Sequence, residues 1–205
     1  MKTKFNLPGI KKLLLPRPTA TDSLRASAFS ARALFGSPPE ATAAERHRSL
    51  VDLLKQVTLF EELDRWELQR LARIVHERDY RDGEYVVEQG KPGAALFVLR
   101  RGVVEVVGRE SKGKEVPIAT LEPPACFEEA AATGTEWLHL FSARARGPVS
   151  VVALGKADLD ALSVNFPLAA NKVLMRLAGV MAMRLQMLLE TQYLKESEEP
   201  QEAEP

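Results

Sequence analysis

The side chains that could do chemistry are few, and most of them lie in one stretch of the chain. Residues 125–132 read ACFEEAAA, which places the thiol of Cys126 two residues before the adjacent carboxylates of Glu128 and Glu129. His139 follows ten residues after Glu129. The sequence shows neither a nucleophile–base arrangement nor a glycine-rich loop of the kind that cradles phosphates. We therefore predict that the protein is not an enzyme.

The cysteine and histidine content excludes most metal and redox chemistry. Cys126 is the only cysteine, so the chain forms no intramolecular disulfide and no cysteine-built zinc or iron–sulfur site. His47, His76 and His139 lie far apart and in no metal-ligand spacing, so we predict no metal site. For Cys126 two interpretations stay open: an inert buried thiol and a redox sensor.

The charge and hydropathy of the chain limit its partners. The 205 residues carry 28 basic and 28 acidic side chains, and this zero net charge argues against a protein that coats nucleic acid. No apolar run reaches about 18 residues, so no transmembrane segment is predicted. There is no secretory apolar core near the start, so we expect a cytoplasmic protein.

Both ends differ from the body in charge. Residues 1–39 carry seven basic residues against one acid, a net charge of +6, and residues 190–205 carry six acids against one base, a net charge of −5. We expect a basic segment at 1–41, a folded domain at 42–194 and an acidic tail at 195–205. The basic segment is interpreted as a disordered tail, a docking helix, a membrane-surface contact or a cleaved targeting segment.

Helices are predicted on both sides of a β-rich middle. Thr42 and Glu45 form a capping-box pattern that starts the first helix, and a second helix is expected over 63–75. Pro167 suits the first turn of a long helix over 168–194, after a short helix over 157–162. The long helix carries a heptad seam with 4-3-4-3-4 spacing, formed by Leu174, Ala178, Met181, Leu185, Leu188 and Gln192. We predict a homodimer through 174–192, with an intramolecular core as the alternative.

The middle of the domain has the periodicity of strands. Short apolar or β-branched runs occur at 85–87, 95–99, 103–107, 116–121 and 149–154. The glycines where tight turns would need a positive φ are Gly83, Gly90, Gly93, Gly102 and Gly113. These features predict a small antiparallel sandwich or barrel.

In this order the elements resemble the cyclic nucleotide-binding domain of catabolite activators, regulatory kinase subunits and channels. The strongest likeness is GEYVVEQG at 83–90, followed by Gly93, LFVL at 96–99 and Gly102. The likeness covers about residues 45–192. It implies an α+β fold, in which N-terminal helices and a long C-terminal helix flank an antiparallel, jelly-roll-like β-roll.

The resemblance also implies a ligand-binding loop. In the family a strand leads into Phe-Gly-Glu, a short helix follows, and an Arg lies ten residues after the Glu. The glycine lets the backbone approach the phosphate, and the Glu accepts a hydrogen bond from a ribose hydroxyl. The Arg donates two hydrogen bonds to the phosphate. The ligand-binding positions implied here are Phe127, Glu128, Glu129, Ala130, His139 and Leu140.

Two of these positions depart from the family. Glu128 stands where the glycine belongs, and His139 stands where the Arg belongs. A charge-assisted Arg–phosphate contact contributes roughly 1.5–3 kcal/mol. A carboxylate about 5 Å from a phosphate costs about 3 kcal/mol at an effective dielectric near 20. The two changes together would weaken binding on the order of a thousandfold.

We therefore expect a non-enzymatic regulatory or sensory module whose pocket is degenerate for cAMP and cGMP and which signals through its C-terminal helix. A weakly bound cyclic nucleotide is the one cofactor considered. The alternative is a ligand-independent adaptor whose charged ends dock an unknown protein. DNA is not an expected partner, since about eleven residues after Leu194 are too few for a DNA-binding domain.

Overall fold

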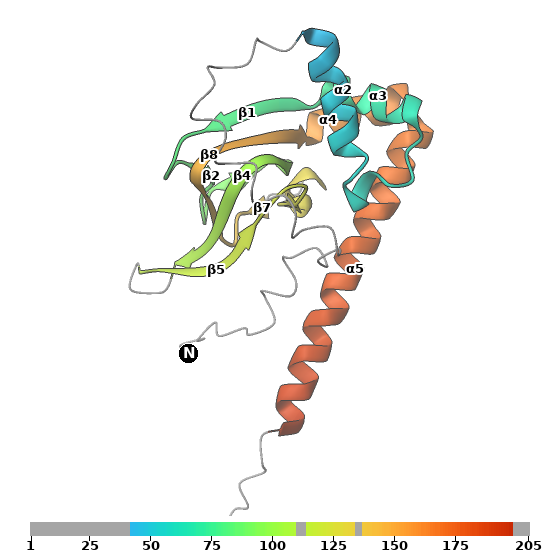
Figure 1. The fold of residues 1–205 in the computed structure, drawn as a ribbon. Helices are drawn as coiled ribbons and strands as arrows, with labels where there is room; N and C mark the ends of the chain where they lie inside the picture. Colours follow the sequence, from blue (N-terminus) through green and yellow to red (C-terminus); the bar gives the residue numbers. More distant parts are fainter. Residues whose placement is uncertain (1–41, 110–113, 134–136, 199–205) are drawn as a thin grey trace, which may run out of the picture.

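The computed structural model describes residues 42–109, 114–133 and 137–198, and Figure 1 shows an antiparallel sheet beside a group of helices. The predicted segment 1–41, most of the predicted tail and Gly113 lie outside the described residues. The helices are α2 (Ala43–Leu54), α3 (Arg65–Ile74), α4 (Lys156–Asn165) and α5 (Pro167–Glu198), with 3-10 helices η4 (Thr58–Phe60) and η5 (Glu129–Thr133). The strands are β1 (His76–Tyr80), β2 (Tyr85–Val87), β3 (Pro92–Gly93), β4 (Ala95–Arg109), β5 (Glu115–Leu121), β6 (Cys126–Phe127), β7 (Trp137–Leu138) and β8 (Ser142–Gly155).

The strands form one large sheet and one small one. The large sheet has the order β1-β8-β4-β5, with β2 paired to β8 and β6 paired to β4, and the small sheet pairs β3 with β7. Every pairing in the described residues is antiparallel. The predicted α+β class and antiparallel β-roll are confirmed.

Strand alternation divides the buried residues between two cores. On β4, Leu96 and Val98 join the core beneath the helices, whereas Phe97 and Leu99 face the interior of the roll. Both faces of β4 and β8 are thus buried, which explains why their sequences are continuous apolar runs rather than alternating ones.

The helices pack together at one end of the sheet, and α5 runs from there past it (Figure 1). The Thr42–Glu45 capping box is present, with Glu45 N donating to Thr42 Oγ1 at 3.2 Å. An equivalent box at Asp64 and Glu67 starts α3. Pro167 is the first residue of α5, as predicted, and α5 continues to Glu198. No described helix is long and apolar enough to cross a membrane.

Two local predictions are wrong. The runs 95–99 and 103–107 are parts of one strand, β4, because the register shifts at Arg100–Arg101 and again before Val103 form bulges instead of a turn. Gly102 does have a positive φ of 85°, but Gly93 does not. Gly93 instead allows close packing, since a Cβ there would lie 2.7 Å from Cε1 of His139.

Candidate ligand site

The loop at 126–139 is fixed to the sheet at both of its ends. β6 pairs with β4 in the register Phe97↔Phe127, and the two rings stack with centroids 5.5 Å apart. At the other end, His139 N donates to Lys91 O at 3.0 Å, and Gly90 N donates to His139 O at 2.8 Å. The sheet therefore sets where Glu128, η5 and His139 lie.

Glu128 occupies a backbone position that suits glycine. Its φ is 60°, in the left-handed region, and it is the only described non-glycine residue with a positive φ. Holding a residue with a Cβ in this region costs on the order of 1–2 kcal/mol. The loop has thus kept a glycine-type conformation at the position where the resemblance expects glycine.

The two residues that depart from the family contact each other. Glu128 Oε2 lies 2.6 Å from Nδ1 of His139. The His139 side chain is only 6% exposed and packs against Gly93. The imidazole thus satisfies the carboxylate that replaces the glycine.

Glu129 is paired with a cation from the long helix. Its two carboxylate oxygens accept hydrogen bonds from Arg184 of α5, at 2.6 and 2.7 Å. The Glu129 side chain is 6% exposed. This bidentate contact joins the loop to α5, 55 residues later in the sequence.

Burial shifts the acid–base behaviour of this cluster. Burial raises the pKa of Glu128, although the hydrogen bond from His139 opposes this. Burial lowers the pKa of Arg184, but the hydrogen bonds to Glu129 and the negative charges of Glu129 and Glu128 together raise it overall. Burial, together with the charge of Glu129, raises the pKa of Cys126 well above its ordinary value. The thiol is thus held protonated, which favours the inert interpretation.

The remaining predicted residues lie around this cluster without joining it. Phe127 is buried in the roll, and Ala130 is half-buried. Leu140 is 60% exposed, beside the buried His139. Among the described residues no three metal-binding side chains lie close enough together to hold an ion.

Arg184 is a site residue that the sequence pattern alone did not single out. The heptad seam draws attention to the apolar positions of α5, and Arg184 lies just outside that seam. A signal was nevertheless present, because residues 173, 177, 180 and 184 share the face of α5 that packs on the body. A single cation on that face indicates a buried carboxylate opposite it.

The comparisons with known proteins agree with this architecture. Residues 77–165 match the family model described as the cyclic nucleotide-binding domain. The cGMP-dependent protein kinase egl-4 of Caenorhabditis elegans is 30% identical over 107 residues, which span 51% of this chain and 14% of the kinase.

Solved structures of cyclic nucleotide-binding proteins are similar to this chain as well. The catabolite activator protein of Thermus thermophilus has a TM-score of 0.60 and 28% identity, covering 68% of this chain and 63% of that chain. A cyclic nucleotide-binding domain from Methylobacillus flagellatus KT has a TM-score of 0.60 and 21% identity, covering 73% of this chain and 83% of that chain.

Proposed function

We propose that the protein is a non-enzymatic regulatory module whose own side chains close its nucleotide site, because residues 77–165 match the model of the cyclic nucleotide-binding domain. The observation that carries this proposal is the pair of contacts Glu128–His139 and Glu129–Arg184. They engage the loop residues that a cyclic nucleotide would need. In this proposal the module acts in the cytoplasm, and its charged ends bind a protein partner.

The Glu128–His139 pair opposes phosphate binding in two ways. A phosphate at the loop would meet the carboxylate of Glu128, which repels it, and an imidazole that is already engaged. Rotating Glu128 away would leave His139, 6% exposed, without its partner. The affinity for cAMP and cGMP is therefore millimolar or weaker, on the order of a thousandfold below a micromolar site.

The Glu129–Arg184 contact supports signalling through α5. A ribose hydroxyl could bond to Glu129 only in competition with Arg184, which already takes both oxygens. A ligand that displaced Arg184 from Glu129 would also break the contact that holds Arg184 and α5 against the loop. The loop and the helix thus form one coupled unit, in which the pair holds α5 in place.

The exposed face of α5 supports self-association, which we propose as the output of the module. The seam residues Leu174, Met181 and Leu185 are 42%, 38% and 57% exposed. They lie beside the face that packs on the body, so they do not belong to the core of the described domain. A second copy of the helix would bury them.

The substitutions Met181→Lys and Leu185→Lys test this interface. Together they should convert a dimer to a monomer in light scattering at tens of micromolar protein. Met183→Lys is the matched control, because Met183 is 59% exposed but lies on the opposite side of the helix from Leu174. A wild-type protein that is monomeric at this concentration would remove self-association from the proposal.

The second candidate is a ligand-independent adaptor that uses the fold as a scaffold. The closed cluster favours it, because each charged group in the cluster already has a partner. Thermal unfolding with millimolar cyclic mono- and dinucleotides separates the two functions, since a ligand of the folded state raises the melting temperature by mass action. A module that binds another cyclic nucleotide should show a higher melting temperature with that nucleotide, whereas the melting temperature of an adaptor should change with none of them.

A further inference from the structure

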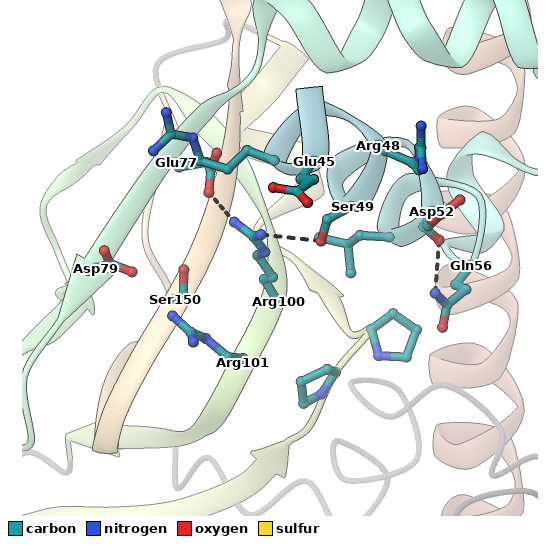
Figure 2. Close-up of a pocket in the computed structure, with 14 residues that line it drawn as sticks. Glu45, Arg48, Ser49, Asp52, Gln56, Glu77, Asp79, Arg100, Arg101 and Ser150 are labelled. Atoms are coloured by element: carbon teal, nitrogen blue, oxygen red, sulfur yellow. Dashed lines mark hydrogen bonds and ion pairs between the residues drawn. The ribbon is translucent and has the colours of Figure 1, made fainter. Parts of the chain in front are cut away.

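A groove of about 740 Å³ opens on the outer face of the large sheet, and none of the described residues of the 126–139 loop lines it. Strands β1, β8 and β4 form its floor and α2 forms one wall (Figure 2), and Pro123 and Pro124 after β5 also line it. A volume of this size is typical of ligand-binding clefts. The polar groups in the groove that lack a partner indicate what it could bind.

A β-bulge delivers two consecutive arginines to this groove. Neighbouring residues of a regular strand point to opposite faces of the sheet. The register of β4 against β8 shifts between Leu99 and Arg101, so both Arg100 and Arg101 line the groove. Bulges that redirect side chains in this way are frequent beside binding sites.

The two arginines differ in their partners. Arg100 donates to Glu77 of β1 and to Ser49 of α2, which ties the floor to the wall (Figure 2). Arg101 is exposed and makes no ion pair or hydrogen bond through its side chain within the described chain. Its guanidinium therefore remains available for an anionic group.

A serine hydroxyl accompanies Arg101. Ser150 of β8 is directly opposite Arg101 in the register, lines the groove and is 3% exposed. None of the hydrogen bonds in the described residues involves its Oγ, and because no buried side-chain oxygen there lacks a partner, this oxygen is reached from the groove. A hydroxyl can donate to a carboxylate or accept from an amide, so it complements Arg101 in binding a peptide.

The shape and the remaining charges define the kind of occupant. Residues of α2 from Glu45 to Leu53 line the groove, a rise of about 12 Å, which matches roughly four residues of extended chain. The charged lining is balanced, with four acidic side chains (Glu45, Asp52, Glu77 and Asp79) and four basic ones (Arg46, Arg48, Arg100 and Arg101), so it does not favour a polyanion. Pro123 and Pro124 add apolar surface. These features fit a short peptide with one acidic side chain better than nucleic acid or an anionic membrane.

We propose that the groove between α2 and the outer face of the sheet is a docking site for an acidic peptide segment of a protein partner. The acidic side chain binds Arg101 and Ser150, and an apolar neighbour packs against Pro123 and Pro124. The inference does not depend on whether the nucleotide site is closed.

Arrays of capped eight-residue peptides, probed with the full-length chain, test this proposal. Each peptide carries Glu at a fixed central position, and matched peptides carry Gln or Lys there. Glu peptides should bind, and the Gln versions of the best binders should bind at least tenfold more weakly in solution, about 1.4 kcal/mol.

Three variants assign that binding to the groove. Arg101→Ala should weaken it at least tenfold without changing the unfolding midpoint, since Arg101 is exposed and has no partner among the described residues. Asp79→Asn should strengthen it, because it removes a repelling carboxylate from the strand next to Ser150. Arg78→Ala should change nothing, because alternation places Arg78 on the other face of β1.

Three results would overturn the proposal. The first is an array in which no Glu peptide binds above its Gln match. The second is binding that survives Arg101→Ala. The third is a preference for Lys peptides or for inorganic phosphate, which would assign the groove to a different class of ligand.

Discussion

The loop at 126–139 and the groove beside α2 are both lined by charged side chains, yet they differ in how those charges are satisfied. In the loop, Glu128 and Glu129 are each paired, with His139 and Arg184. In the groove, Arg101 and Ser150 have no side-chain partner in the part of the chain that the structure describes. The charges of the loop are thus satisfied within the chain, whereas Arg101 in the groove is left to solvent.

The physical reason for this difference is burial. A buried carboxylate without a partner destabilises the fold, so the loop can keep two of them only by supplying two partners from its own chain. In the groove, the guanidinium of Arg101 stays in water, where a free charge costs little. Substitutions should therefore act on stability in the loop and on binding in the groove.

The largest expected effect on stability comes from breaking the contact between the loop and α5. Glu129→Ala leaves Arg184 with no carboxylate in a largely buried position, so the free energy of unfolding should fall by about 3 kcal/mol. Urea unfolding monitored by circular dichroism measures this. Adding Arg184→Met should restore at least about 1 kcal/mol, because the unpaired charge is then gone.

An exposed pair on the same helix provides the control. Arg176 of α5 bonds to Glu61, and that carboxylate side chain is 47% exposed. Glu61→Ala should therefore cost less than about 1 kcal/mol. Equal losses for Glu61→Ala and Glu129→Ala would contradict the distinction between a buried loop cluster and solvated surface charges.

A smaller effect concerns the pH dependence of Glu128. Burial raises its pKa above the ordinary 4.5, so the folded protein holds this proton more tightly than the unfolded chain does. Its contribution to stability is full below the ordinary value and is lost as the pH rises through the raised pKa. Glu128→Gln has no such loss and should gain stability relative to wild type as the pH rises from the ordinary value of 4.5 through the raised pKa. A difference between the two proteins that is constant or shrinks over this range would contradict the sign.

Much of the fold could be predicted from the sequence because its signals are local. The capping box at Thr42, the apolar runs and Pro167 at the start of α5 each depend on residues a few positions apart. Strand β1 was missed, because HERDY has no apolar alternation and four of its five residues are exposed. Its position is set by pairing with β8, far away in the sequence.

The candidate site could be predicted only in part. Its loop and the two departures at Glu128 and His139 follow from spacing along the chain. Their mutual contact does not, because two separate substitutions give no sign that the side chains meet. The pairing of Glu129 with Arg184 and the double arginine at the β4 bulge also depend on tertiary geometry.

The central claim is that two substitutions disarm the nucleotide site, and calorimetric titration with cAMP and cGMP tests it most directly. The wild-type protein should bind millimolar or more weakly. Glu128→Gly removes the repelling carboxylate and suits the positive φ at position 128. His139→Arg restores a side chain that can donate two hydrogen bonds to the phosphate. The double variant should therefore bind cyclic nucleotides at least about tenfold more tightly than the wild type. Adding Glu129→Ala should remove much of that gain. Wild-type binding at a few micromolar, or no gain in the double variant, would contradict the account.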